Sequence, residues 1–337
     1  MFKFLFVVLL LLVSSCDNDR ENFTFNESGD SWVFVANEGS YGNTNGTISM
    51  ISSNGEYFET PVIGDVVQSL EVYGNKLIVL VNNSHKMKIF DITDEGLSMP
   101  GVEIDLDNSS PREMVIIDNK VYFTNWNSQD IKVFNLFNYS IETQIPVEGL
   151  PEDIAFDGQY LWVTIPHSDN FFTSGTTVCK IDPLLNEVIQ TLDVGDGPQQ
   201  IAIKGDEIFI SRTFYDSSWN SFYGASKISE NEVSINNYGS GAPCGGAIIS
   251  HNSNMMRSSG GGLAIMDDQL NLLPVSIGDF NQNQVYHVEK IQGNFWFALT
   301  DYEDFNEVHV VNSFGETINI FQVGYLPGDF AFWSNND

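Results

Sequence analysis

The amino-acid sequence predicts an all-β protein built from one repeated unit. From Trp32 onward, short runs of β-branched and aromatic residues alternate with turns rich in glycine, asparagine and aspartate. We find no convincing amphipathic helix along the 337 residues. One pattern, in which a proline opens a strand and a polar turn leads to a second strand, recurs in PREMVIIDNKVYFTNW, PEDIAFDGQYLWVTIP and PQQIAIKGDEIFISRT.

The units follow one another at nearly even intervals. On a common register they begin at Val67, Pro111, Pro151, Pro198, Pro243, Val285 and Pro327. The successive intervals are 44, 40, 47, 45, 42 and 42 residues. Most units add a third strand, such as MKIFDI or IKVFNL, and a fourth, such as IETQIPV or TINIFQV. Four strands in roughly 43 residues are typical of a β-propeller blade.

The two ends of the chain complement each other. The segment from Pro327 supplies one inner strand, whereas WVFVANE, GTISMIS and YFETPVI near the N-terminus supply the three strands that are missing. We therefore predict seven four-stranded blades, with the ring closed by N- and C-terminal segments in one blade. Closure removes the exposed strand edges that invite aggregation. A β-sandwich or two separate domains would fit the even spacing less well.

The first 15 residues are expected to form a signal peptide. One lysine precedes an apolar run from Phe4 to Val13, and small residues follow before Cys16. The run is too short to span a bilayer, which takes ~20 residues. Because a cysteine after small residues resembles the bacterial lipobox, we expect cleavage before Cys16 and its lipidation; an ordinary secretory signal is the alternative. Residues 16–30 are predicted to be an acidic flexible tether, and residues 31–337 the propeller.

The charge of the chain narrows the range of partners. The formal net charge is −31, and affinity for nucleic acids depends on lysine and arginine contacts with phosphates. We therefore expect no nucleic-acid partner, and we expect acyl chains alone to hold the protein at a membrane. Cys179 and Cys244 remain once Cys16 is lipidated, and the sequence leaves open whether they pair.

The loops between second and third strands are predicted to carry the binding site. They share one face of the ring, and they are longest in the units that begin at Pro151 and Pro198. Rigid aromatic rings provide contact area at low entropic cost. The predicted ligand-binding residues from these loops are Trp126, His167, Phe171, Phe172, Phe214, Tyr215, Trp219, Phe222, Tyr223 and Tyr302. For any single ring, folding back as a local core is the alternative.

Polar residues that open the inner strands are predicted to rim a central channel. They are Gln68, Arg112, Glu113, Glu152, Asp153, Gln199, Gln200, His287 and Asp329. Of these, Arg112 and Gln199 complete the predicted ligand-binding set. The rim could hydrogen-bond a polar small-molecule ligand or hold channel water only.

The sequence contains no recognisable catalytic motif. GxSxG, HExxH, Walker loops and Cys/His clusters are absent, and the five histidines are scattered. We therefore predict a binding protein and not an enzyme, with no catalytic residues, no metal site and no cofactor. A propeller hydrolase, lyase or quinoprotein that uses rim acids such as Asp153 is the less favoured alternative.

Units such as PEDIAFDGQYLWVT resemble the YVTN-type propeller repeat. The opening WVFVANEGSYGNTNGTISMIS resembles the start of a family of bacterial cell-surface lipoproteins, through Asn37, Glu38, Gly39, Tyr41, Gly42, Asn45, Gly46 and Thr47. That group includes proteins that capture cobalamin for a TonB-dependent outer-membrane transporter, and DNDRE after Cys16 is similar to their export tag. The resemblance implies a lipid anchor in the outer membrane facing the exterior, a bound corrinoid (vitamin B12) and such a transporter as partner. A glycan- or protein-binding surface propeller is the alternative.

Overall fold

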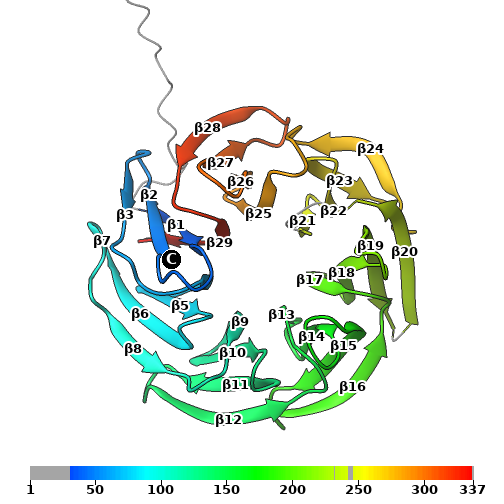
Figure 1. The fold of residues 1–337 in the computed structure, drawn as a ribbon, viewed down its shortest axis with the longest axis horizontal. Helices are drawn as coiled ribbons and strands as arrows, with labels where there is room; N and C mark the ends of the chain where they lie inside the picture. Colours follow the sequence, from blue (N-terminus) through cyan, green and yellow to red (C-terminus); the bar gives the residue numbers. More distant parts are fainter. Residues whose placement is uncertain (1–30, 231, 242–245, 336–337) are drawn as a thin grey trace, which may run out of the picture.

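The structure, a computed structural model, describes residues 31–230, 232–241 and 246–335. The predicted signal peptide (1–15), the lipidation site Cys16, the predicted tether (16–30), Pro243 and Cys244 lie outside the described residues. Within these ranges, the strands form seven antiparallel sheets around a central axis, with no helix (Figure 1). The predicted seven-bladed β-propeller is therefore confirmed.

Each blade runs from an inner strand at the central channel to an outer strand at the periphery. Blade 1 consists of β29 (Pro327–Ser334), β1 (Ser31–Asn37), β2 (Thr47–Ser52) and β3 (Tyr57–Glu59). Blade 2 consists of β4 (Val67–Tyr73), β5 (Lys76–Val81), β6 (Lys86–Thr93), β7 (Gly96–Leu97) and β8 (Val102–Asp105). Blade 3 consists of β9 (Pro111–Ile117), β10 (Lys120–Asn125), β11 (Asp130–Asn135) and β12 (Ser140–Pro146).

The remaining four blades follow in chain order. Blade 4 consists of β13 (Ile154–Phe156), β14 (Leu161–His167), β15 (Ser174–Asp182) and β16 (Glu187–Asp193). Blade 5 consists of β17 (Pro198–Lys204), β18 (Glu207–Tyr215), β19 (Ser221–Ser229) and β20 (Glu232–Ser240). Blade 6 consists of β21 (Ile248–His251), β22 (Asn254–Ser259), β23 (Gly262–Met266) and β24 (Leu272–Ile277). Blade 7 consists of β25 (Val285–Ile291), β26 (Asn294–Thr300), β27 (Asn306–Val311) and β28 (Thr317–Gln322).

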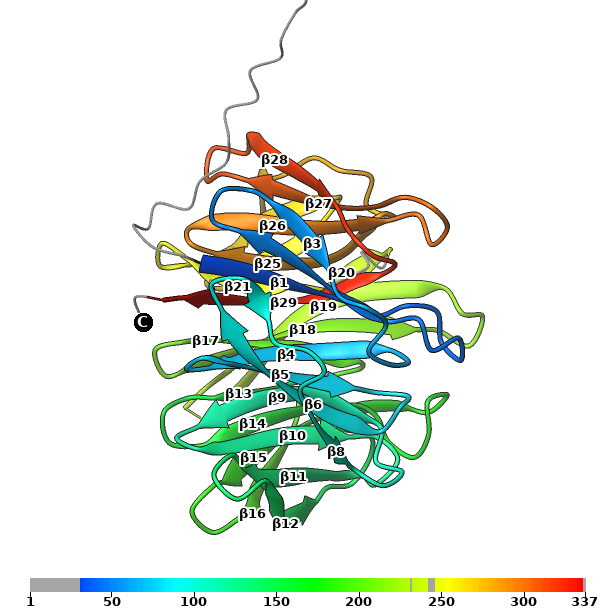
Figure 2. The ribbon, with the colours of Figure 1, turned by 90° about the vertical axis from the view of Figure 1, so that its left-hand side faces the viewer.

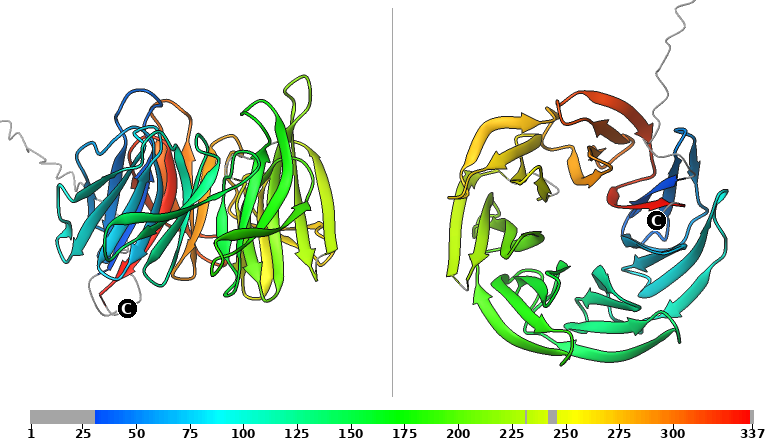
Figure 3. Two further views of the ribbon diagram at one scale, coloured as in Figure 1. Left: turned by 90° about the horizontal axis from the view of Figure 1, so that it is seen from below. Right: turned by 180° about the vertical axis from the view of Figure 1, so that it is seen from behind.

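Blade 1 joins the two ends of the described chain. Strand β29 pairs antiparallel with β1 from Ser31 opposite Ser334 to Asn37 opposite Pro327. Figures 1 and 3 show the two strands side by side at the point where the ring closes. Trp32 on β1 and Trp333 on β29 are buried in one hydrophobic cluster with residues of β4 and β5. The closing blade is therefore both hydrogen-bonded and packed against its neighbour.

The cores of the blades are aliphatic and aromatic, as alternating strand residues predict. The aromatic residues on second strands are buried: Phe123, Trp162, Phe209, Trp296 and Phe297. Burying a large aromatic side chain contributes about 2–3 kcal/mol or more. These rings hold the sheets face to face around the channel.

Side-chain hydrogen bonds also link neighbouring inner strands. Thr124 Oγ1 accepts a bond from the Glu113 backbone N–H at 3.0 Å and donates to the Glu152 carbonyl of the next blade at 2.6 Å. Thr164 occupies the same place one blade on and bonds Asp153 and Gln199 in the same way. In blades 3 and 4 the repeated threonine therefore ties the start of one inner strand to the next, and it positions the side chains that face the channel there.

The sequence predicts that Phe214, Tyr215, Phe222 and Tyr223 lie in a loop, but they lie on paired strands, which corrects that prediction. Strands β18 and β19 continue their pairing through Phe214 opposite Phe222, so only residues 216–220 form the connection. On β22 of the next blade, Arg257 is fully buried. Its guanidinium donates to the backbone carbonyls of Gly224, Ser258 and Arg212. A strand with polar residues can be buried here because these donors are satisfied.

Candidate ligand-binding site

A cavity of about 1030 Å³ opens at the centre of the ring. Its walls come from the starts of the inner strands and from the ends of the β14–β15 and β18–β19 hairpins. In the edge-on view of Figure 2, the end of the β18–β19 hairpin and the end of β29 lie at opposite faces of the ring. The cavity therefore opens on the face that the sequence predicted to bind ligand.

One position of the repeat supplies the innermost wall. The residue that follows each unit start lines the cavity in six units: Gln68, Arg112, Glu152, Gln199, Tyr286 and Gly328. Strand geometry explains this, because the same step after the same turn points each side chain in the same direction. The predicted rim residues Glu113, Asp153, Gln200, His287 and Asp329, one position further on, line it too.

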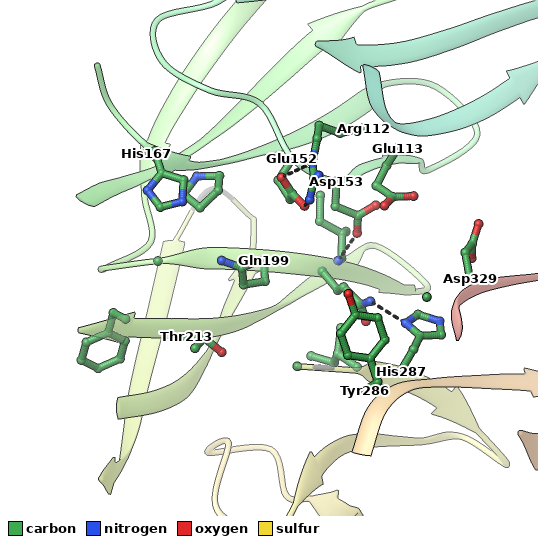
Figure 4. A pocket seen from close by; sticks show the side chains of 18 of the residues that line it. Arg112, Glu113, Glu152, Asp153, His167, Gln199, Thr213, Tyr286, His287 and Asp329 are labelled. Atoms are coloured by element: carbon green, nitrogen blue, oxygen red, sulfur yellow. Dashed lines mark hydrogen bonds and ion pairs between the residues drawn. The ribbon is translucent and has the colours of Figure 1, made fainter. Parts of the chain in front are cut away.

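Arg112 is the centre of a hydrogen-bond network in this wall (Figure 4). Its Nε and Nη2 donate to the two carboxylate oxygens of Glu152 at 3.0 and 2.5 Å, and its Nη1 donates to Gln68 Oε1 at 2.7 Å. The guanidinium lies 4.5 Å from the ring centroid of Trp126. Burial opposes its charge, but Glu152, Glu113 and Glu38 raise the pKa of Arg112, so it is a cation. Bidentate pairing and stacking together are geometries that lysine cannot provide.

Carboxyl groups from several blades face the channel beside this network. Burial raises the pKa of Glu113 well above its usual value, and the charges of Asp329 and Asp153 raise it further. Burial raises the pKa of Asp153 to about 6, although the backbone N–H groups of Ile201 and Ile154 lower it. Burial likewise raises the pKa of Asp329. Some of these groups therefore keep their protons near neutral pH.

His287 lies across the channel from Arg112 (Figure 4). Burial opposes its charged form, but the carboxylates of Glu289, Asp329 and Glu38 outweigh that effect and raise the pKa of His287. Its Nδ1 is 3.5 Å from Gln200 Nε2. The side chains at the starts of the inner strands, including Arg112, Glu113, Glu152, Asp153, His287 and Asp329, thus form a polar and mainly acidic floor of the cavity.

An aromatic ridge extends from this floor over blades 3 to 5. It consists of Trp126, His167, Phe171, Phe172, Trp219 and Tyr215, each of which has a neighbouring ring centroid within 4.9 to 6.2 Å. At its outer end, Phe172 is 76% exposed and Trp219 is 61% exposed. Large exposed rings that gather at a cavity mouth mark an interaction site, because folding alone does not need them.

The inner end of the ridge carries two ring nitrogens that lack partners. Trp126 Nε1 and His167 Nδ1 are buried and make no hydrogen bond within the described part of the chain. Burial lowers the pKa of His167, so its imidazole is neutral at pH 7. Buried polar atoms normally have partners, so Trp126 Nε1–H can donate a hydrogen bond to a ligand, and His167 Nδ1 can donate or accept one according to its tautomer.

The structure brings ten of the predicted site residues to the cavity: Arg112, Trp126, His167, Phe171, Phe172, Gln199, Phe214, Tyr215, Trp219 and Tyr302. Phe222 and Tyr223 lie outside its lining, which corrects the prediction for them. Phe222 stacks on Phe214 with centroids 5.8 Å apart, and Tyr223 packs against Tyr238 on β20. The reason is their place on a paired strand, where neighbours on the next strand cover them.

Glu38 and Tyr286 are among the lining residues that the sequence interpretation does not include. Glu38 follows β1, and Tyr286 is the second residue of the unit that starts at Val285. Position in the repeat is the available signal for Tyr286, since it occupies the same place in its unit as Arg112.

Within residues 31–335 as described, no three histidine, cysteine, aspartate or glutamate side chains are arranged to hold a metal ion. Cys179 is buried on β15, with Sγ 3.8 Å from Thr191 Oγ1. The same described ranges contain no helix with the length and apolar character needed to cross a membrane.

Comparisons with known proteins add support at the level of fold. No protein-family model matches the chain, and no curated protein matches it. A proposed 6-phosphogluconolactonase from Bacteroides fragilis is similar with a TM-score of 0.63 at 13% identity, over 91% of this chain and 99% of that chain. A hypothetical selenium-binding protein from Sulfolobus tokodaii has a TM-score of 0.63 at 10% identity, over 92% of both chains. Apo AztD from Citrobacter koseri has a TM-score of 0.55 at 11% identity, over 90% of this chain and 98% of that chain. What this chain shares with these proteins is the β-propeller architecture.

Proposed function

We propose that this chain binds a small molecule without transforming it, and that the ligand is a corrinoid. The observation that carries the proposal is the meeting of an aromatic ridge and a polar floor in one cavity. The volume of about 1030 Å³ lies at the upper end of the usual range for small-molecule sites, about 300–1000 Å³, and suits a large ligand.

The chemistry of the lining fits such a ligand. A corrin ring is broad and flat, so one face can lie against the aromatic ridge. Its carboxamide side chains both donate and accept hydrogen bonds, and they would meet Gln199, the carboxyl groups of the floor, and the free nitrogens of Trp126 and His167. The walls of the cavity belong to the packed blades of the propeller. Such a rigid site would lose little conformational entropy on binding and would release its ligand slowly.

The proposal extends to location and partner. We place the protein at the outer membrane, facing the exterior and anchored by lipid at Cys16, where it would hand its ligand to a TonB-dependent transporter. The support is the leader-like segment 1–15 and the resemblance of residues 37–47 to surface lipoproteins. No catalytic step is part of this role.

Lipidation is tested by labelling cells with an alkyne fatty acid. The wild-type chain is expected to incorporate the label, and Cys16→Ala is expected to lose it because the acceptor thiol is gone. Detection after immunoprecipitation measures the effect directly. Equal labelling of the two proteins would place the acyl chain elsewhere and remove the proposed anchor.

Ligand binding is tested by titrating purified residues 22–337 with cyanocobalamin. We expect saturable binding, and we expect Trp126→Ala and Trp219→Ala each to weaken it about tenfold or more, because central aromatic residues dominate such sites. Isothermal calorimetry gives the dissociation constants, and thermal unfolding confirms that the variants fold. Phe314→Ala is a matched control, since Phe314 is 87% exposed and lies outside the cavity lining. No binding at micromolar cyanocobalamin would dispose of the corrinoid.

A glycan is the second candidate ligand. The outer end of the ridge favours it, because the exposed rings of Phe172 and Trp219 could stack on sugar faces. A glycan array separates the two: specific glycan binding that Trp219→Ala abolishes, without cyanocobalamin binding, would select this alternative.

A further inference from the structure

We infer that the inner end of the cavity is a subsite for a positively charged group of the ligand, and that Glu113 is the carboxylate that pairs with it. The inference rests on the proposed function, because it names the chemical class that the same cavity takes. The carboxyl groups on the floor of the cavity differ in how many hydrogen bonds they already accept.

Three of the other carboxyl groups near Glu113 are already engaged. Glu152 binds Arg112 through both oxygens. Asp153 accepts bonds from the backbone N–H groups of Ile201 and Ile154, at 2.6 and 2.8 Å. Asp329 accepts equivalent bonds from Leu70 and Phe330, also at 2.6 and 2.8 Å. These groups are structural acceptors with little remaining capacity.

Glu113 differs from them. Within the described residues, its carboxyl group accepts one long bond, from Gln68 Nε2 at 3.3 Å. Gln68 is itself fixed, because its Oε1 accepts from Arg112. A carboxylate can accept about four hydrogen bonds, so Glu113 has unused capacity that faces the cavity.

The charge around Glu113 is unbalanced. The ionisable side chains that line the channel from neighbouring elements are Glu38 after β1, Arg112 and Glu113 on β9, Glu152 and Asp153 before β13, His287, Glu289 and Lys290 on β25, and Asp329 on β29. Arg112 is neutralised by Glu152, and Lys290 Nζ donates to the Ser250 carbonyl at 3.3 Å. More carboxyl groups than cations therefore share the floor, and an arriving cation would relieve their repulsion.

A second group at this end also lacks a full set of partners. His287 is 9% exposed, and its Nε2 makes no hydrogen bond within the described ranges; the nearest carboxylate oxygen, Oε2 of Glu289, is 3.5 Å away. The raised pKa of His287 favours its charged form, whose Nε2–H can donate to an acceptor atom of the ligand, so the channel at this residue has room for a ligand atom.

The aromatic ridge favours the same class of ligand. Ring faces attract cations, as Arg112 over Trp126 already shows within the protein. A flat cation can therefore lie along the ridge and place its charge at Glu113. Because burial and the neighbouring carboxylates raise the pKa of Glu113, binding of a cation beside it favours loss of its proton.

The test uses two flat tricyclic probes, the cation proflavine and the anion anthracene-9-carboxylate. The binding of each probe is measured by its fluorescence in 0.15 M salt. We expect the wild-type protein to bind proflavine at micromolar concentrations and to bind the anion at least tenfold more weakly. Proflavine affinity is expected to rise with pH, because a higher pH favours the ionised form of Glu113. Equal affinity for both probes, or no proflavine binding, would overturn the inference without any variant.

The variant Glu113→Gln tests whether Glu113 is the residue that pairs with the cation. It is expected to weaken proflavine binding about tenfold or more and to reduce the pH dependence, part of which Asp153 and Asp329 retain because their pKa values are raised to about 6 and about 7. Glu187→Gln makes the same substitution on the exposed strand β16 and is expected to leave binding unchanged. An equal loss in both variants, or none in Glu113→Gln, would contradict the role of Glu113. Proflavine binding that depends on Glu113, without cyanocobalamin binding, would refute the corrinoid and keep the cation subsite. Cyanocobalamin binding without Glu113-dependent proflavine binding would keep the corrinoid and refute the cation subsite.

Discussion

Removing residues 327–337 is expected to abolish cooperative folding. The truncation deletes β29, which pairs with β1 from Ser31 to Asn37 and buries Phe330 and Trp333. Large-to-small changes at one such aromatic residue cost about 3–5 kcal/mol, so losing the strand would exceed a total stability of about 5–15 kcal/mol. It would also expose an unpaired edge on β1. Urea unfolding followed by circular dichroism, with gel filtration for aggregates, measures the result.

Two further variants test whether the loss of folding comes from the missing closing strand. Removing only residues 336–337 leaves β29 intact and is expected to preserve the unfolding midpoint. Trp333→Ala keeps the strand pairing and is expected to cost about 3–5 kcal/mol while unfolding stays cooperative. A chain without β29 that still unfolds in one transition near the wild-type midpoint would show that the ring does not depend on its closing blade.

Stability is expected to fall as pH rises from 5 to 9, and Glu71→Gln is expected to remove much of that fall. Burial, assisted by the charges of Asp329 and Glu289, raises the pKa of Glu71 from 4.5 to about 8. Between those values the folded chain keeps a proton that the unfolded chain has released. Because the folded state then binds more protons, raising the pH destabilises it. The pKa of Asp153, raised to about 6, acts in the same direction over a narrower range.

The size of this effect follows from the shift. Each pKa unit corresponds to about 1.4 kcal/mol, so the rise from 4.5 to about 8 is expected to cost roughly 5 kcal/mol of stability above pH 8 and almost nothing below pH 4.5. Glutamine cannot ionise, so Glu71→Gln should be more stable than the wild-type chain at pH 9 and similar at pH 4.5. Urea unfolding at both values measures it, with Glu187→Gln as an exposed control. A wild-type chain that gains stability from pH 5 to 9 would contradict the ionisation described for Glu71.

The fold could be predicted because its signal is periodic. Strand residues and turns recur at intervals that depend on local sequence alone, and Val67 and Pro198 begin inner strands as expected. The extents of the hairpins could not be predicted, because the pairing of Phe214 with Phe222 depends on how far two strands stay together. The burial of Arg257 depends on carbonyl groups from another blade.

Some features of the candidate site could also be predicted from the sequence, and others could not. Membership of the cavity follows from position in the repeat, so Arg112 and Gln199 could be identified from the sequence. Their electrostatics could not, because Arg112 takes partners from two other blades, Gln68 and Glu152. The ionisation of Glu113 likewise depends on residues more than two hundred positions away, such as Asp329.

The residue after the unit start lines the cavity in six units; five of these residues carry a side chain, and the sixth is Gly328, where a Cβ atom would clash with Glu38 Oε1. Gln68, Arg112 and Glu152 are joined by hydrogen bonds, so a change at one of them affects the other two. Gln199 could become another residue in one descendant and Tyr286 in another, and each change would alter one sector of the surface only. A ring of this kind can acquire new specificities in single, separable steps, and related chains could recognise different molecules with nearly the same backbone.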